Sequence, residues 1–212
     1  NATLIQNLPT LIDPPPTGHS KVDCNSYRLS VGNEVFVTRD QSKLGCKSSS
    51  IRLGENETVD IPSGQFCLVL SEEKVNIPTT VMGFISIRAK KKSKGLINVS
   101  GFHVDPGYNG RLIFAVFNAG PSKLTLRRGD DIFLLWLSWL DNAEDPNGSY
   151  NNNKSIKDII PTDMINSLNG QVPSTAVLNE NVESIKTKIN TWLGAASIIV
   201  IALIGGAGWG YA

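Results

Sequence analysis

The sequence predicts a mainly β domain followed by a long α-helix. Up to about residue 142, short apolar segments recur, and Gly, Pro, Asn and Asp separate them. Closely spaced short strands with turn residues between them are typical of an all-β sandwich or barrel. From residue 178 onward, apolar or small residues are instead spaced three and four positions apart, which is the period of a helix.

The composition divides the chain further. The strand prediction rests on short apolar segments at residues 34–37, 64–70, 112–117 and 131–137. Alternating apolar and polar positions are the pattern of a half-buried strand. The predicted units are a β domain over 1–142, an Asn-rich polar connector over 143–173, a helical stalk over 174–190 and an apolar helix over 191–212.

The turn over residues 101–110 is the most informative stretch for function. It holds Asp105, a Pro-Gly pair, Tyr108 and a further glycine between two apolar runs. Predicted strands on both sides would fix the carboxylate and the aromatic ring on a rigid scaffold. Binding and catalytic sites are commonly built from polar groups held in this way. Asp105 and Tyr108 are therefore candidate site residues.

Charge and cysteine content restrict the partners. The formal net charge is +1 at pH 7, so the surface as a whole offers no attraction to a polyanion, and no nucleic-acid partner is expected. Cys24, Cys46 and Cys67 are odd in number and have no metal-ligand spacing, which predicts free thiols in a reducing compartment.

The C-terminal pattern is a heptad seam. Alternating steps of four and three residues predict a helix that associates with copies of itself. The seam consists of Leu178, Val182, Ile185, Ile189, Trp192, Ala196, Ile199, Leu203, Gly206 and Gly210.

The last part of this helix predicts a membrane anchor. From Trp192 to Tyr211 there is no charged residue, and about 20 apolar residues are enough to span a bilayer. Lys186 and Lys188 precede this segment, so the positive-inside rule predicts a single-pass C-terminal anchor with a cytoplasmic β domain. A buried core helix is the alternative, but little other sequence remains to bury it.

Several segments together resemble the dCTP deaminase and dUTPase superfamily, over roughly residues 20–140. The Asp-Pro-Gly-aromatic-x-Gly turn at 105–110 makes the deaminase branch the nearer one. The resemblance implies a distorted β-barrel or jelly roll that assembles as a homotrimer, with nucleotide sites between subunits. It rests on residues 63–78, 88–96, 101–110, 118–120 and 128–132.

Four residues match positions that the family uses. By resemblance, Asp105 is the carboxylate that activates water, and Tyr108 packs on the deoxyribose. Asn118 matches the family asparagine, and Arg88 opens the phosphate-binding segment. The resemblance also implies Mg²⁺ bound together with the nucleotide.

Other positions depart from the family pattern. Ala89 and Lys90 replace two small hydroxyl residues that hydrogen-bond phosphate. Ala115 stands where the deaminase branch has its glutamate proton shuttle, and alanine cannot transfer a proton. Arg28 replaces an aspartate near the metal and the phosphates, and Leu134 replaces a glutamine.

A basic run lies inside the phosphate-binding segment. Residues 90–94 contain four lysines, and Lys90 is next but one to Arg88. Such runs are usually solvated helix faces, but these cations could also replace the missing hydroxyls as phosphate ligands. Contact with anionic lipid is a third reading. The acidic pairs at 72–73 and 130–131 are interpreted as turns.

The function predicted from these features is a membrane-anchored homotrimeric protein that senses a nucleotide and has lost deaminase chemistry. A role as a membrane effector in phage defence is one extension of that hypothesis. An active membrane-tethered dUTPase or dCTP deaminase is the enzymatic alternative, with Asp105 as its catalytic base. A trimerisation scaffold without a ligand is the third hypothesis.

Overall fold

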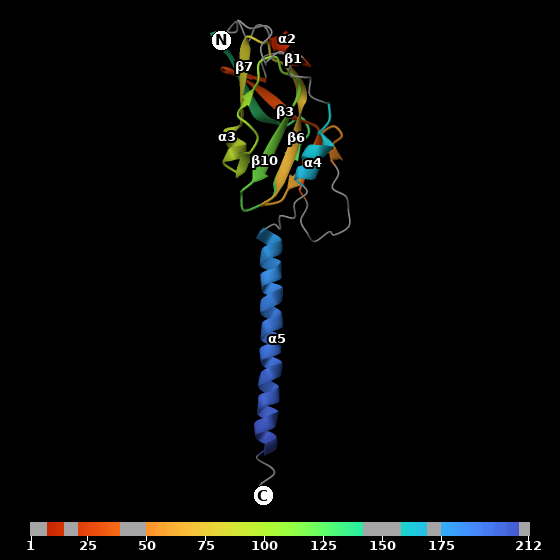
Figure 1. The fold of residues 1–212 in the computed structure, drawn as a ribbon, viewed down its shortest axis with the longest axis vertical. Coiled ribbons are helices and arrows are strands. Elements are labelled where there is room, and N and C mark those ends of the chain that lie inside the picture. The colour runs from red at the N-terminus through yellow and green to blue at the C-terminus, as the bar shows by residue number, and fades with distance from the viewer. Residues whose placement is uncertain (1–7, 15–20, 39–49, 142–157, 169–174, 208–212) are drawn as a thin grey trace. The chain divides into compact units, whose positions relative to one another are not determined.

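The computed structural model describes residues 8–14, 21–38, 50–141, 158–168 and 175–207. The chain divides into two compact units, Asn1–Val172 and Pro173–Ala212 (Figure 1). The first unit holds all the described strands, and the second holds one long helix. The helices of the first unit are α2 (Leu8–Leu11), α3 (Ala89–Lys92) and α4 (Thr162–Ser167), and that of the second is α5 (Thr175–Ala207).

The first unit is a curled antiparallel sheet. Its strand order is β8-β10-β6-β3-β12-β7-β9, with β1 on β6 and with β2 and β4 on β3; β5 and β11 form a separate pair. The strands are β1 (Ile12–Asp13), β2 (Val22–Asp23), β3 (Ser26–Val37), β4 (Ile51–Arg52), β5 (Thr58–Ile61), β6 (Phe66–Asn76), β7 (Val81–Ile87), β8 (Leu96–Asn98), β9 (His103–Val104), β10 (Asn109–Asn118), β11 (Leu124–Arg127) and β12 (Asp131–Trp139).

The predicted mainly β fold is thereby confirmed. Strand β10 shows its physical basis, because its even-numbered residues from Gly110 to Asn118 are buried while the residues between them are half-buried or exposed. One face of the strand therefore lines the main core. There the rings of Phe114 and Phe133 stack with their centroids 3.6 Å apart and join β10 to β12.

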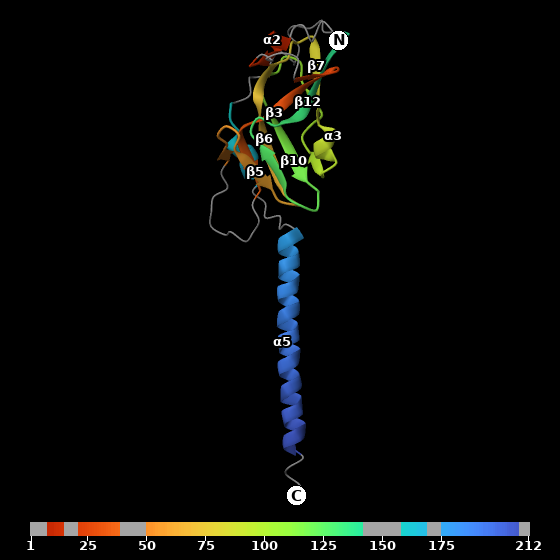
Figure 2. The same ribbon diagram turned by 180° about the vertical axis from the view of Figure 1, so that it is seen from behind.

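A second, smaller core lies on the other face of the sheet. Helix α4 and the residue Ile160 before it pack on β3, β6 and β10, and this cluster comprises Phe36, Leu68, Leu70, Ile160 and Ile165, with Ile113, Ala115, Met164 and Leu168 around it. The backbone N–H of Ile160 donates to the Glu34 carboxylate at 2.9 Å. Part of the predicted polar connector is therefore integrated into the β unit. Figures 1 and 2 show α3 and α4 on opposite sides of that unit.

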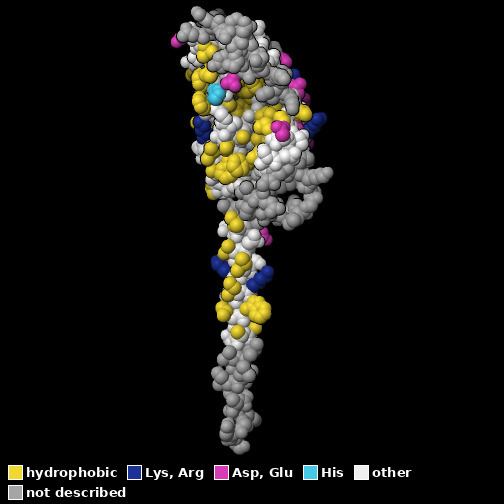
Figure 3. Space-filling model, in the orientation of Figure 1, with side chains coloured by type: hydrophobic (Ala, Val, Ile, Leu, Met, Phe, Trp, Pro, Cys, Tyr) yellow, Lys and Arg dark blue, Asp and Glu magenta, His cyan; other side chains and the backbone are white. Residues whose placement is uncertain are grey.

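The second unit is a single helix across the predicted stalk and apolar segment. Its described side chains include the first part of the seam, and Leu178, Val182, Ile185, Ile189 and Trp192 are all exposed. Figure 3 shows hydrophobic side chains along the described part of this helix.

The structure does not support the predicted membrane anchor. Among the residues that the structure describes, none of the helices combines the length and the apolar character that crossing a bilayer requires. The predicted localisation, a C-terminal single-pass anchor with the β domain in the cytoplasm, is wrong on this finding. Residues 208–212 of the predicted apolar helix lie outside the described part of the chain.

Candidate functional site

The turn that carries Asp105 and Tyr108 is held by backbone hydrogen bonds. The N–H of Tyr108 donates to the Asp105 carbonyl at 3.2 Å, and Gly107 adopts a φ of 79°. The N–H of Gly107 donates to the Ile77 carbonyl, and that of Ile77 donates to the Tyr108 carbonyl. The turn is therefore fixed to Ile77, the residue that follows β6.

The two candidate side chains in this turn differ in access to solvent. The Asp105 side chain is 51% exposed, and its Oδ1 lies 3.4 Å from Nε2 of His103. Tyr108 is half-buried against the main core, and burial raises the pKa of its phenol. Its hydroxyl donates to the Arg111 carbonyl. Asp105 can therefore meet a ligand or water, whereas the Tyr108 hydroxyl already has a backbone partner.

Arg88 and Lys90 lie on a different segment, which follows β7. Arg88 is the residue before α3, and its Nη1 donates to the Asp131 carbonyl at 3.1 Å. This bond ties the end of β7 to β12, so Arg88 has a structural partner as well as a candidate role. Lys90 is exposed on α3.

The strand register keeps these two groups apart within one chain. Val104 pairs with Gly83 in antiparallel β7 and β9, so Asp105 lies toward the start of β7. Arg88 follows the opposite end of β7, which is Ile87. Arg88 is five positions after Gly83, which is about 16 Å along a strand. One chain therefore does not bring Arg88 and Asp105 to the same ligand atoms.

Asn118 is fully buried, and its side-chain amide is occupied. Its Nδ2 donates to the carbonyls of Ile61 and Ser122, both at 2.9 Å, and its Oδ1 accepts from the N–H of Gly120 at 3.0 Å. These bonds fold the loop after β10 back onto the strand. Asn118 thus shapes the surface around it through this loop.

Ala115 lies in an apolar environment. Its side chain is on the outer face of β10, within the cluster formed with α4. The aliphatic side chains of Met164 and Ile165 from α4 are part of that cluster. The position that carries a glutamate in the deaminase branch is therefore covered by the chain itself, with apolar groups as neighbours.

Two other departures from the family pattern are neighbours in space. Arg28 on β3 and Leu134 on β12 are cross-strand partners. A cation and an aliphatic side chain therefore occupy positions where the resemblance implies an aspartate and a glutamine. Within the described ranges, no group of three or more His, Cys, Asp or Glu side chains could hold a metal ion.

A buried polar network was missed by the sequence interpretation, which assigned the acidic pairs to turns. Glu73 lies within β6 with its side chain only 2% exposed. Its carboxylate accepts from Lys21 Nζ at 2.5 Å and from the backbone N–H and hydroxyl of Ser30. Asp131, in β12, is an alternative acceptor for the single proton of this hydroxyl, at 2.9 Å. The only sequence signal was the inward position of Glu73 in an alternating strand.

The adjacent Glu72 also has a structural role. Its carboxylate accepts from Arg128 Nη2 at 2.9 Å and from Arg128 Nε at 3.2 Å, a bidentate pair. This pair raises the pKa of the Arg128 guanidinium, chiefly through the hydrogen bond. The two neighbouring glutamates therefore stabilise the fold and do not form a paired-carboxylate site.

The fold and the turn agree with the superfamily that the sequence motifs resemble. The family model described as dCTP deaminase-like matches residues 2–138. The chain belongs to the dCTP deaminase-like family.

Individual relatives agree with this assignment. The chain is 28% identical over 143 residues to the dCTP deaminase of Thermococcus kodakarensis, a match that covers 66% of this chain and 86% of that one. It is 28% identical over 146 residues to the dUMP-forming dCTP deaminase of Aquifex aeolicus, covering 66% and 81%.

A solved structure supports the fold. The 2'-deoxycytidine 5'-triphosphate deaminase from Agrobacterium tumefaciens superposes with a TM-score of 0.52 at 14% identity. The match covers 64% of this chain but only 46% of that deaminase, so it spans less than half of the solved chain. The similarity therefore supports the arrangement of the strands and not a shared activity.

Proposed function

We propose that this protein binds a deoxynucleotide and has lost the deaminase reaction of its family. The observation that carries the proposal is the environment of Ala115. A deaminase needs a group that transfers protons at the base, and the methyl side chain of Ala115 has no ionisable proton. Ala115 instead packs in an apolar cluster with residues of α4, which is a poor environment for transferring a proton.

The binding part of the proposal rests on the turn. Asp105 is exposed and oriented by a backbone that three hydrogen bonds fix. Tyr108 offers part of its ring beside it. Such a preorganised polar and aromatic pair suits recognition of a sugar, because little conformational entropy is lost on binding.

The separation of Asp105 from Arg88 supports a site shared between copies of the chain. A nucleotide with its sugar at Asp105 cannot place its phosphates at Arg88 of the same chain, because about 16 Å of strand lies between them. In a homotrimer, the turn of one copy would face Arg88 and Lys90 of the next. Each site would then need two chains.

The long helix favours the same assembly. Val182 and Ile189 occupy a positions of the heptad, and Ile185 occupies a d position, all on the exposed stripe. Lys186 and Lys188 then fall at e and g. In a parallel arrangement, g contacts the e position of the next heptad, so Lys188 would face a leucine and not another lysine. The charge pattern therefore permits parallel association of three α5 helices.

Mg²⁺ fits this proposal only as a companion of the nucleotide. Since the described residues form no metal-ligand cluster, the cation would be held mainly by phosphate oxygens. Mg²⁺ commonly binds in this way, through substrate phosphates and few protein ligands. Asp105 would be the negatively charged protein group nearest to the cation.

Thermal stabilisation and product analysis with each deoxynucleoside triphosphate test the proposal. We expect a concentration-dependent rise in Tm with at least one of them, without release of deaminated base or pyrophosphate, with and without Mg²⁺. Asp105→Asn should abolish the rise, whereas Arg52→Gln, an exposed charge on β4, should leave it unchanged. If none of the nucleotides raises Tm, the proposal of nucleotide binding is wrong and a scaffold role remains.

Retained hydrolysis is the second candidate function. The exposed Asp105 carboxylate, 3.4 Å from His103, is a chemically competent base for water. Release of pyrophosphate that Asp105→Asn removes would establish this activity and overturn the proposal of a binding protein. Release that survives the substitution would instead indicate a contaminating enzyme.

A further inference from the structure

A polar groove lies at the end of α3, away from the turn with Asp105. Its volume is about 790 Å³, and its walls come from residues 91–95 and 119–125. This size is within the range of small-molecule sites. Neither Arg88 nor Lys90 lines it. Its polar side chains include Lys91, Lys92, Lys94, Lys123, Ser122 and Thr125.

The two walls are held at a fixed distance by the backbone. The N–H of Ala119 donates to the Gly95 carbonyl at 2.9 Å. A Cβ on Gly120 would lie 2.3 Å from the Lys94 carbonyl oxygen, so only glycine permits this approach. The side chain of Asn118 fixes the same loop through Gly120 and Ser122. The groove is therefore built before any ligand arrives.

The groove is electropositive. Among its described lining residues there are four lysines and no acidic side chain. Two of these cations have acidic partners outside the lining, since Lys123 Nζ lies 2.6 Å from Asp60 and Lys91 Nζ lies 3.7 Å from Asp130. Figure 3 shows dark blue Lys and Arg side chains at the edge of the β unit where Figure 1 places α3.

Two lysines remain to attract an anion. Lys92 Nζ donates to the Ser86 hydroxyl at 2.7 Å, which leaves its charge uncompensated. Lys94 is exposed and, within the described part of the chain, forms no ion pair. Both belong to the α3 wall, and Lys123 adds to the opposite wall an ammonium group that Asp60 partly neutralises.

We propose that this groove binds a linear polyphosphate, either free or as the phosphate chain of a nucleotide. Ammonium groups on both walls suit an extended anion with several charged units, and the hydroxyl of Ser122 can donate to its oxygens. A single phosphate would meet only one wall. The inference does not depend on nucleoside recognition at Asp105, because the two sites share no residue.

Titration calorimetry with sodium tripolyphosphate tests the site on the full chain. We expect saturable binding that weakens as salt is added, because screening acts within about 10 Å at 0.1 M ionic strength. Lys94→Met and Lys123→Met should each weaken binding roughly threefold to tenfold, the range of one partly exposed charge-assisted contact. These lysines are exposed, so the variants should fold, which circular dichroism checks.

The substitution Asp60→Asn should change the affinity for tripolyphosphate in the opposite direction. The Asp60 carboxylate accepts hydrogen bonds from Lys123 and Thr125, which lower its pKa. Removing its charge frees Lys123 for the ligand, so affinity for tripolyphosphate should rise by roughly twofold to fivefold. Arg52→Gln, the matched removal of an exposed charge outside the groove, should leave the affinity unchanged.

Comparison of ligands completes the test. Orthophosphate should bind more weakly than tripolyphosphate, and Asp105→Asn should not affect either. Deoxycytidine triphosphate is compared with tripolyphosphate in the Asp105→Asn variant, so that binding at the turn does not contribute. Tighter binding of deoxycytidine triphosphate there would indicate the phosphate chain of a nucleotide, and equal or weaker binding a free polyphosphate. Equal loss in Arg52→Gln, no saturable binding, or tighter binding of a short single-stranded oligonucleotide would each overturn the proposal. The last result would indicate a nucleic-acid partner.

Discussion

Lys21 Nζ lies 2.5 Å from Glu73 Oε1. Lys21 is the residue before β2, and its ammonium group neutralises a carboxylate whose side chain is only 2% exposed. The same ammonium is 3.5 Å from Asp131, and the Ser30 hydroxyl bridges the two carboxylates. Tyr27 is nearby, and burial, with the charges of Glu73 and Asp131, raises the pKa of its phenol. Three strands meet at this network.

Replacing Lys21 should destabilise the β unit. In Lys21→Met the buried Glu73 charge loses its cation, and removing one partner of a buried pair typically costs about 3–5 kcal/mol. Lys21 is 32% exposed, so we expect roughly 2 kcal/mol in urea unfolding. Lys123→Met breaks the exposed pair with Asp60 and should cost less than about 1 kcal/mol. Adding Glu73→Gln to Lys21→Met should recover part of the loss, and a loss no greater than that of Lys123→Met would contradict the assigned role.

The close approach of Gly95 and Gly120 predicts a second effect on stability. Gly120→Ala places a Cβ 2.3 Å from the Lys94 carbonyl oxygen, which is backbone and cannot move aside freely. We expect a loss of roughly 2–4 kcal/mol, since the clash must displace a loop or a strand end. Gly101→Ala is the control, because a Cβ there meets no atom within 4 Å. Thermal unfolding of both variants separates packing from any general effect of glycine replacement.

Restoring the family glutamate should not restore deamination. In Ala115→Glu the carboxylate enters the apolar cluster beneath α4, where ionisation is unfavourable without a partner. We expect α4 to be released, with a loss of about 1–3 kcal/mol, visible as faster hydrogen exchange of residues 162–167. Ala119→Glu, at an exposed position, should leave α4 protected. Deamination of dCTP by Ala115→Glu would show that Ala115 is the sole missing element.

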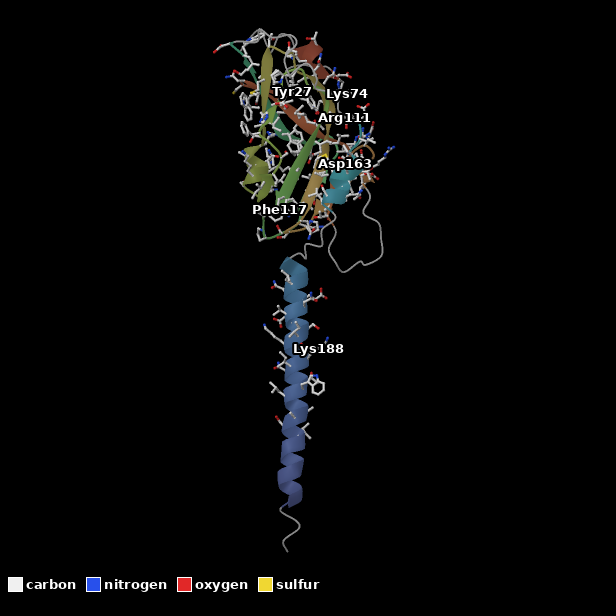
Figure 4. All side chains as sticks on the ribbon, viewed as in Figure 1. Tyr27, Lys74, Arg111, Phe117, Asp163 and Lys188 are labelled. Carbon is white, nitrogen blue, oxygen red and sulfur yellow. The ribbon has the colours of Figure 1, made fainter. Side chains whose placement is uncertain are left out.

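The exposed stripe of α5 predicts association through the helix. Gln in place of Ile185 and Ile189 removes two apolar residues from the predicted seam, so the helix loses its partners. Hydrogen exchange of residues 178–192 should be slow in the full chain and become fast in the double variant. Thr187→Gln changes an outer position of the same helix and should have no such effect. Equal exchange in all three proteins would rule out a helical stalk. Figure 4 labels Lys188, the residue before Ile189, on this helix.

Local rules explain why much of the fold was predictable. The short apolar run over residues 112–117 identifies β10, and the Pro-Gly turn after Asp105 predicts the bend that Gly107 makes with a φ of 79°. The family motifs lie in these same short segments, so the superfamily could be identified from them. The spacing of apolar residues likewise predicts α5 as a helix.

The environment of individual side chains was not predictable in the same way. The sequence could not tell that Ile160 and Ile165, within an Asn-rich connector, cover the outer face of β10. Ile160, Met164, Ile165 and Leu168 are spaced as on one face of a helix, but the pattern covers too few residues to identify a packed helix from sequence. Only contact with the sheet distinguishes this short helix from a linker. In the connector the sequence failed to reveal a packed segment. In the C-terminal helix it led to a wrong prediction, because composition alone suggested a membrane anchor.

The sequence by itself determined the mainly β fold, the family and the turn with Asp105 and Tyr108, because short apolar runs and turn chemistry depend on neighbours in the chain. Only the tertiary structure decided that Asn118 is buried and holds a loop, that Arg88 lies at the far end of β7 from Asp105, and that lysines from two segments meet in a groove. These relationships depend on strand register and on long-range packing, which join residues that are distant in sequence.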